Sequence, residues 1–380
     1  MVKAGLPIHT TASKYPTSVN EPFTFLGIYF ATNHISGFII KNQEKSKMVK
    51  ADLHIHTTAS KYPTSDKDPF KFLGIQDCYV HPEEVYKTAK KKGMDFVGIT
   101  DHHSIEAALY LDAKYPDIII GEELDVKASD DGHLIHLLVY NINEKQHHDL
   151  SDLRNIGVKE TCEYTRKNDI IHSWAHPNLS PVKAVLSKKL IDELMNYIDR
   201  VEIKNGFDTR TGNNFAKDIA KNYSKKISGG SDAHIKSFIG DVFTHNNSTR
   251  NKADFLEALK EGEVEVSGLD MNSYKLQKMI YQFAYQSLVM DIFLNPHKRV
   301  RENYKKYFLD QFVILTTFFP LLVTLLPSIF ISYIHEKASD KRTLKLSSEL
   351  AVRFLNNNYK EIVHSAGKSK PRIEFSKGVV

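Results

Sequence analysis

From Met48 to Gly268, short apolar runs alternate with amphipathic stretches, and this alternation restricts the possible folds more than any other feature of the chain. Each apolar run is short enough for one strand, and each amphipathic stretch is long enough for a helix. The first predicted helix has Pro82 at its first position, glutamates in its first turn and Gly93 after its end. Repeated strand–helix alternation indicates a parallel sheet with barrel or doubly wound topology.

Polar side chains that can bind metals recur where the predicted strands end. The strands are expected at residues 52–56, 95–102, 117–126, 133–141, 170–177, 200–206 and 226–234. The helices are expected at 82–92, 104–115, 153–167, 188–198, 213–223 and 252–261. The polar side chains are His54, His56, Asp101, His102, Glu123, His136, His176, Asp232 and His234. In βα barrels the strand ends at one face hold the active site, so we expect these side chains to meet.

The segment Asp52-x-His54-x-His56 illustrates why these residues suggest a metal site. Side chains alternate along an extended strand, which places both imidazoles on one face, where they can chelate one cation. For this pair alone, a satisfied pair of core histidines is the alternative, and the metal reading depends on the ligands at the other strand ends. A mixture of His, Asp and Glu without thiolate favours Zn²⁺, Mn²⁺ or Fe.

Charge is distributed unevenly along the chain. Residues 48–269 hold 29 basic and 35 acidic side chains, a net −6, whereas residues 1–47 carry +3 and residues 270–380 carry +8. An acidic, histidine-rich domain suits bound divalent cations and does not resemble a clamp for a nucleic-acid backbone. The two cysteines, Cys78 and Cys162, form no CxxC pair, so we expect a reducing, intracellular compartment.

Six motifs in order resemble the polymerase-and-histidinol-phosphatase (PHP) family. They are DLHIHTTAS (52–60), GITDHH (98–103), GEEL (121–124), HLIH (133–136), AHP (175–177) and GSDAH (230–234). The resemblance covers about 220 residues and implies an α/β fold, a distorted seven-stranded βα barrel of the PHP type. It also implies two or three divalent metal ions (Zn, Mn or Fe) at the carboxyl ends of the strands.

The resemblance also implies a ligand set. His54, His56, Glu123 and Asp232 match ligands of a first metal; Glu123 would bridge to a second metal bound by His136 and His176; His102 and His234 match a third. Glu122 is the competing carboxylate in GEEL, and Glu123 is preferred because the family's glutamate lies two positions after the glycine. The further histidines His103, His133 and His172 are expected to support the site or the fold.

Lys61 departs from the family pattern, because many relatives have an aspartate here that completes the third metal's shell. A protonated lysine cannot ligate a cation. The third metal is then absent, weakly held, or completed by a displaced carboxylate such as Asp66 or Asp68. Alternatively, Lys61 contacts the phosphate of the substrate.

The implied activity is metal-dependent hydrolysis of phosphate esters, in which a hydroxide shared by two cations attacks phosphorus. Asp101 is expected to orient the site, His102 or His234 to protonate the leaving oxygen, and Arg210, near Asn205, to bind phosphate; a surface role for Arg210 is the alternative. The predicted substrate is a small phosphorylated metabolite, a nucleotide or the end of a short oligonucleotide. The alternatives are a non-catalytic, metal-binding regulatory module and an amidohydrolase-like enzyme acting on a C–N bond.

The two flanks have predictions of their own. Residues 2–28 match residues 49–75 at 21 of 27 positions, but Gly5 and Pro7 replace Asp52 and His54. Residues 1–47 are therefore interpreted as a degenerate partial duplication, or as sequence upstream of a true start at Met48. Residues 269–380 are predicted to form a helical, hydrophobic extension with a basic tail. Within it, residues 312–334 carry no charge and are long enough to span a bilayer, which would anchor a cytoplasmic catalytic domain. A buried helical hairpin and a re-entrant loop are the alternatives.

Overall fold

The computed structural model describes residues 48–61, 76–130, 132–179, 186–247, 249 and 251–288, together with positions 337 and 345. The proposed duplication at 1–47, the candidate membrane segment 312–334 and the basic tail lie outside these residues, as do Asp66 and Asp68. Among the described residues, no helix combines the length and the apolar character needed to cross a membrane.

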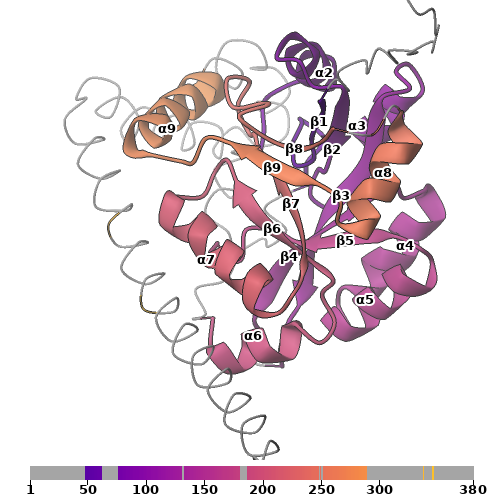
Figure 1. Cartoon of the computed structure of the whole chain (residues 1–380). Helices are drawn as coiled ribbons and strands as arrows, with labels where there is room; N and C mark the ends of the chain where they lie inside the picture. The colour runs from indigo at the N-terminus through magenta and orange to yellow at the C-terminus, as the bar shows by residue number, and fades with distance from the viewer. Residues whose placement is uncertain are drawn as a thin grey trace, which may run out of the picture. The chain divides into compact units, whose positions relative to one another are not determined.

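A nine-stranded sheet forms the centre of the described region (Figure 1). Its strands are β1 (Val49–Asp52), β2 (Phe96–Ile99), β3 (Ile118–Lys127), β4 (Leu134–Tyr140), β5 (Ile171–Trp174), β6 (Arg200–Asn205), β7 (Lys226–Gly230), β8 (Val242–Asn246) and β9 (Glu265–Gly268). Their order in the sheet is β7-β6-β5-β4-β3-β2-β1-β8-β9, so the first seven strands follow the order of the chain.

Contacts beyond the ends of β1 and β7 bring the two sides of this seven-strand array together. The chain after β1 bridges the chain after β7 in parallel, at Ile55 and Ala233. The amide of His56 donates to the carbonyl of Ala233, and the amide of Asp232 donates to the carbonyl of His54. Gly230 permits this approach, since a Cβ there would lie 2.6 Å from the amide nitrogen of His54. The strands therefore form a nearly closed, distorted barrel.

Two features of the sheet differ from the prediction. The strand–helix alternation predicts a parallel sheet, but β4 is antiparallel to both β3 and β5, and β8 is antiparallel to β1 and β9. No helix separates β3 from β4 in the chain, and a short connection can return only to an antiparallel strand. The two extra strands β8 and β9 extend the sheet beside β1.

Helices pack on the outside of the strands (Figure 1). They are α2 (Pro82–Lys91), α3 (Glu106–Asp112), α4 (Glu144–Leu153), α5 (Val158–Lys167), α6 (Lys188–Leu194), α7 (Arg210–Asn222), α8 (Lys252–Glu261) and α9 (Ser273–Leu288). The single helix predicted at 153–167 is wrong: α5 begins only after Gly157, and α4 precedes it. Asn143 starts α4 through a capping box with Gln146, a signal that the apolar pattern does not reveal.

The apolar core keeps this layer of helices against the strands. One cluster joins β3, β4 and β5 to α5, α6 and α7, around the fully buried Trp174 and Phe215. A second joins β2 and Ile55, which follows β1, to α2 and α3, with Ile99 and Leu111 fully buried. Burying a side chain of this size contributes about 1.5–3 kcal/mol, so the core holds the strand ends in place.

Candidate metal centre

A group of histidines and carboxylates lies at one end of the barrel, where the parallel strands have their carboxyl ends and the antiparallel strand β4 has its amino end. His54 and His56 follow β1, His102 follows β2, and Glu123 and His136 lie within β3 and β4. His176 follows β5, and Asp232 and His234 follow β7. All the predicted metal residues except His234 are buried. Among the described residues, four groups of side chains could each hold a metal ion, because the ligand atoms within a group lie within 4.8 Å of one another. The groups are His54, His56, Glu123 and Asp232; Glu123, His136 and His176; His56, Asp77, His102 and His234; and His102, Asp125 and His136.

The first group, which we call cluster 1, consists of the four residues predicted for the first metal. The Nε2 atoms of His54 and His56 are 3.2 Å apart. They lie 3.0 and 3.2 Å from Oε2 of Glu123, and 3.4 and 3.2 Å from Oδ1 of Asp232. Four ligand atoms therefore face one point from four sides.

The second group, cluster 2, uses the other oxygen of Glu123. Oε1 of this carboxylate lies 2.8 Å from Nδ1 of His136 and 3.0 Å from Nε2 of His176, and the two nitrogens are 3.4 Å apart. Oδ2 of Asp232 is 3.8 Å from His176. Glu123 therefore presents one oxygen to each cluster, as a bridging ligand between two cations would.

The spacing of these atoms fits a divalent cation. Ligand atoms bound at 2.0–2.2 Å to a tetrahedral zinc ion lie about 3.3–3.5 Å from one another. The separations within cluster 1 run from 3.0 to 3.4 Å, so the cluster would widen only slightly around an ion. Two unprotonated imidazole nitrogens at 3.2 Å would repel each other unless a proton or a cation lies between them. The donor set of imidazole and carboxylate suits Zn²⁺, Mn²⁺ or Fe and does not identify the metal.

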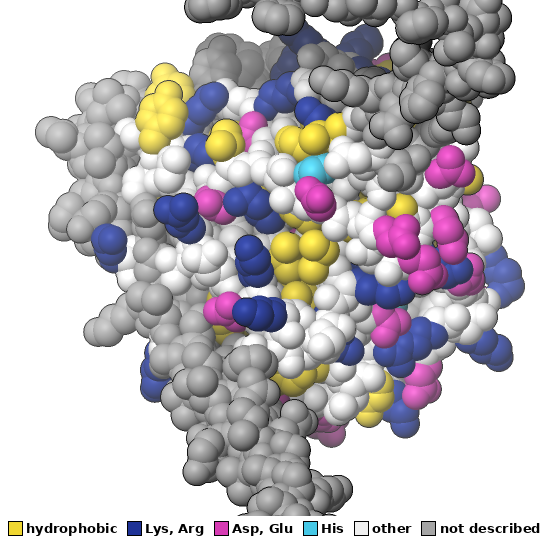
Figure 2. Space-filling model, viewed as in Figure 1, with side chains coloured by type: hydrophobic (Ala, Val, Ile, Leu, Met, Phe, Trp, Pro, Cys, Tyr) yellow, Lys and Arg dark blue, Asp and Glu magenta, His cyan; other side chains and the backbone are white. Residues whose placement is uncertain are grey.

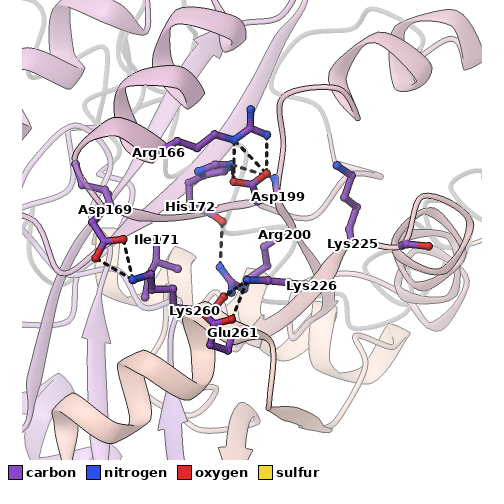
Figure 3. A pocket seen from close by; sticks show the side chains of 12 residues that line it. Arg166, Asp169, Ile171, His172, Asp199, Arg200, Lys225, Lys226, Lys260 and Glu261 are labelled. Atoms are coloured by element: carbon purple, nitrogen blue, oxygen red, sulfur yellow. Dashed lines mark hydrogen bonds and ion pairs between the residues drawn. The ribbon is translucent and has the colours of Figure 1, made fainter.

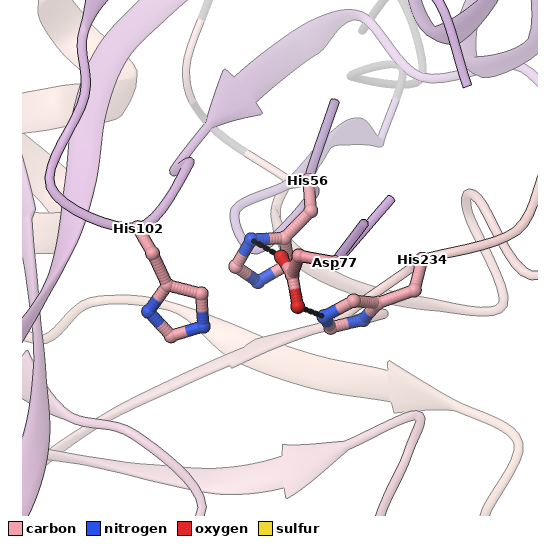
Figure 4. Close-up of side chains that lie close together, drawn as sticks. All are labelled: His56, Asp77, His102 and His234. Atoms are coloured by element: carbon pink, nitrogen blue, oxygen red, sulfur yellow. Dashed lines mark ion pairs between the residues drawn. The ribbon is translucent and has the colours of Figure 1, made fainter. Parts of the chain in front are cut away.

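The third group, cluster 3, includes a carboxylate that the sequence reading missed. Asp77 lies between the rings of His56 and His234, at 3.5 Å from Nδ1 of the first and 3.2 Å from Nε2 of the second, with His102 facing them (Figure 4). Asp77 therefore occupies the place of the displaced carboxylate for which Asp66 and Asp68 were considered. The ammonium group of Lys61 instead forms an exposed ion pair with Glu106 at 2.9 Å.

Two further carboxylates hold the ligand histidines from behind. Oε1 of Glu202 is 3.1 Å from Nδ1 of His54, on the side of the ring opposite cluster 1. Oδ1 of Asp125 is 3.1 Å from Nε2 of His136, whose Nδ1 faces cluster 2. A carboxylate on the second nitrogen of a histidine orients the ring and raises its basicity toward a metal.

Asn205 connects these carboxylates. Its side-chain amide donates to Oε2 of Glu202 at 2.9 Å and to Oδ2 of Asp232 at 3.1 Å. The backbone is also constrained at the site: φ is +50° at Asp232 and +27° at His176. Left-handed backbone at residues other than glycine costs about 1–3 kcal/mol and concentrates at functional sites.

Charge pairing dominates the acid–base properties of the site. Burial alone would lower the pKa of His54, but Asp232 and Glu123 outweigh it and raise the pKa well above its ordinary value. The same balance raises the pKa values of His56 and His136 to about 10. His102 differs, because burial prevails and lowers its pKa to about 3. A cation that binds His54, His56 and His136 must therefore displace protons from them.

Other predicted residues lie outside the four groups. Both carboxylate oxygens of Asp101 accept hydrogen bonds from Thr57, at 2.5 Å from its amide and 2.7 Å from its hydroxyl, which holds the chain beside His56. Glu122 points away from Glu123 and pairs with His147 at 2.8 Å. Arg210 is exposed at the start of α7.

The three additional histidines separate into different surroundings. His103 lies 3.2 Å from Asp125, His133 is buried, and His172 lies at the amino end of β5, where it bonds the Thr165 hydroxyl. On the face shown in Figure 2, lysine, arginine and acidic side chains intermingle and histidine is scarcely visible. This agrees with the burial of the cluster histidines.

Asp77, Asp125 and Glu202 are the functional candidates that sequence reasoning missed. Glu202 is a carboxylate within the buried strand β6, and Asp125 is two residues after Glu123, on the same face of β3. A buried carboxylate needs a partner, so both positions carry a usable signal. Asp77 follows a long connection from Lys61, and nothing local links it to the histidines.

Comparison with known proteins bears on this site directly. Residues 210–264 match a family model described as PHP-associated. No curated protein sequence matches the chain.

Three solved structures are similar to parts of the fold. They are PsfC from Pseudomonas syringae (14% identity, TM-score 0.43, covering 64% of this chain and 99% of that one), a lesion-specific endonuclease from Pyrococcus furiosus (21%, 0.41, 59% and 59%) and an amidohydrolase from Chromobacterium violaceum (14%, 0.40, 57% and 97%).

The matched residues 210–264 contain Asp232 and His234, together with α7, β7, β8 and α8. The resemblance to the PHP family predicted from the motifs is confirmed over residues 210–264, which match the PHP-associated model.

Proposed function

We propose that this chain hydrolyses phosphate esters with the help of divalent cations held in clusters 1 and 2. The proposal depends most on Glu123. One of its carboxylate oxygens faces the histidines of cluster 1, and the other faces the histidines of cluster 2. Two cations held by these residues would supply Lewis-acid charge and an activated water for attack on phosphorus. The side chains of this chain would position the ester and manage its protons.

His234 is the best-placed proton donor for the leaving oxygen. Its side chain is 15% exposed, compared with 5% for His102 and 0% for His56, so it borders the open side of the site. Asp77 holds its Nε2 at 3.2 Å, and its Nδ1 lies 2.9 Å from the carbonyl of Asp232. His102 would serve as a neutral ligand.

The substrate we propose is small: a phosphorylated metabolite, a nucleotide or the end of a short oligonucleotide. Residues 48–269 carry a net charge of −6, which disfavours a long polyanion. A small ester needs only the local charge of the bound cations.

The decisive experiment combines metal analysis of the purified full chain with hydrolysis assays on monoesters, diesters and oligonucleotides. We expect two or three ions per chain and turnover of at least one ester class. Bound metal without turnover of any ester would favour the alternative, a non-catalytic regulatory module. Absence of stoichiometric metal would reject both.

The role of His234 has its own test. His234→Gln should reduce hydrolysis of an alkyl phosphate by about 10²-fold or more and that of a nitrophenyl phosphate much less, because only the poor leaving group needs a proton. Equal losses for both esters would contradict the assignment.

A further inference from the structure

A cavity of about 470 Å³ lies at the opposite end of the barrel from the metal clusters. Its lining comes from the amino ends of β5, β6 and β7, with the ends of α5 and α8 (Figure 3). These three parallel strands lead to His176, Asn205 and Asp232 at their other ends. At 3.3 Å per residue, the cavity is roughly 15 Å from the clusters. We call it the amino-end pocket.

The amino-end pocket has an excess of positive charge. Its lining includes five cations and three carboxylates. The carboxylates are taken up in three ion pairs, at 2.6, 2.8 and 3.9 Å: Arg166–Asp199, Lys260–Asp169 and Lys226–Glu261. Arg200 and Lys225 are left over, and among the described residues neither faces a carboxylate at ion-pair distance. His172 adds no charge near neutral pH, because burial and the neighbouring cations lower its pKa to about 4.

Arg200 is the more buried of the two surplus cations, with 2% of its surface exposed. Its guanidinium donates to the carbonyls of Leu259 and Lys260 at the end of α8, and to that of His172 at 3.4 Å. These bonds account for a structural role. They leave Nε buried without a hydrogen-bond partner in the described part of the chain. A buried guanidinium without a carboxylate is costly unless an anion approaches it.

Lys225 has no comparable structural role. It is half-buried at the rim of the pocket, and within the described residues no hydrogen bond or ion pair involves its ammonium group; Figure 3 shows the side chain without a partner. Burial lowers its pKa. The two cations approach one cavity whose volume falls within the roughly 300–1,000 Å³ typical of small-molecule sites.

We propose that the amino-end pocket binds a small anion that carries one or two phosphoryl groups. A charge surplus of two matches a phosphoryl group, which carries about −1.5 to −2 at pH 7. Arg200 offers a fixed guanidinium from the wall, and Lys225 offers a movable point charge from the rim. The site would be separate from the metal centre and would need no metal.

Titration calorimetry of the full chain with pyrophosphate tests the proposal. The protein is first stripped of metal and freed of chelator, so that no cation at the other end of the barrel can hold the probe. We expect saturable binding of one pyrophosphate per chain, and the same binding in Asp232→Asn. Failure of the stripped wild-type protein to bind pyrophosphate would overturn the proposal.

Variants then locate the site. Lys225→Gln should weaken pyrophosphate binding about tenfold, a loss of ~1.4 kcal/mol, and Lys225→Glu should weaken it further. Lys217→Gln, an equal charge change at an exposed position of α7, is the matched control and should bind as the wild type does. Equal affinity in Lys225→Glu and the wild type would place the anion elsewhere and reject the pocket.

A stability measurement separates ligand binding from a structural role of Lys225. Without ligand, Lys225→Gln should unfold at a temperature equal to or above that of the wild type, because burial disfavours the charged ammonium group. Pyrophosphate should raise the unfolding temperature of the wild type more than that of the variant. If Lys225→Gln is clearly less stable without ligand, Lys225 is a structural residue and the proposal is wrong.

Discussion

The two ends of strands β5–β7 are built from similar residue types, but their charge balance is opposite. At the carboxyl ends, carboxylates such as Glu123 and Asp232 surround histidines and raise the pKa of His56 and His136 to about 10. At the amino ends, burial lowers the pKa of His172 to about 4, and the cations Arg200, Arg166 and Lys225 add to this effect against the opposing carboxylate of Asp199. Histidines at one end thus lie among carboxylates, where a cation can bind, whereas His172 at the other end remains neutral near cations.

The difference shows that burial alone does not decide what a histidine can do. His136 and His172 are both buried, yet their pKa values move in opposite directions because the charges that face them differ. Removing a carboxylate at the metal end should therefore reduce metal binding, whereas removing His172 at the other end should change how stability depends on pH. The predictions below test this contrast, beginning with the largest expected effect.

Asp232→Asn should abolish metal binding in cluster 1 and reduce phosphate-ester hydrolysis by about 10³-fold or more, because a neutral amide replaces a carboxylate that contacts both His54 and His56. Metal content and turnover are measured on the same preparation. Asp199→Asn is the matched control: its carboxylate pairs with Arg166 at the amino end of the barrel and is 41% exposed. Loss of metal in the control, or its retention in Asp232→Asn, would remove the contrast between the two ends.

Glu202→Gln should weaken metal affinity by about 10–100-fold without abolishing it, since the carboxylate supports the ring of His54 and does not face cluster 1. Competition with a chromogenic chelator measures the affinity. Glu122→Gln provides the control, because Glu122 is equally buried and accepts a hydrogen bond from His147 away from the clusters. Equal losses in both variants would point to general destabilisation.

His172 should make folding sensitive to mild acid. Its pKa is about 4 in the folded protein and 6.5 ordinarily. Between pH 4 and pH 6.5, His172 is therefore protonated in the unfolded chain and neutral in the folded chain. The contribution of neutral His172 is present above pH 6.5 and is lost as the pH falls toward 4. From pH 7 to pH 5, the stability advantage of the wild type over His172→Gln should shrink by about 2 kcal/mol. Urea unfolding of both proteins measures it; a constant difference would disprove the neutral state.

Lys61→Met should change turnover by less than about twofold, because the ammonium group pairs with Glu106 where both side chains are more than half exposed. Steady-state kinetics provide KM and kcat separately. A large rise in KM with kcat unchanged would instead show that Lys61 contacts the substrate phosphate, the role considered for it from the sequence.

Where the signal is local, the sequence predicted which side chains the structure brings together as candidate metal ligands. His54 and His56 are two residues apart, and Glu123, His136, His176 and Asp232 belong to motifs at predicted strand ends. The structure places these six residues in two groups that share Glu123. It also places Glu123, and not Glu122, in the clusters, since neighbouring side chains of a strand point to opposite faces.

What the sequence could not predict depends on distant parts of the chain. Asp77 reaches His56 and His234 although it is far from both along the chain. The prediction of one helix at 153–167 failed because the cap at Asn143 and the break at Gly157 outweigh a continuous polar pattern.

The sequence by itself determined which chemical groups stand at which strand ends, because strand alternation and motif order are properties of the chain. Only the tertiary structure decided their proton and metal affinities. His172 and His176 are four residues apart at the two ends of β5. His172 is uncharged near neutral pH because its pKa is about 4, whereas Nε2 of His176 lies 3.0 Å from Oε1 of Glu123. Electrostatic interactions act through space, and the charges that each histidine meets come from strands remote in sequence.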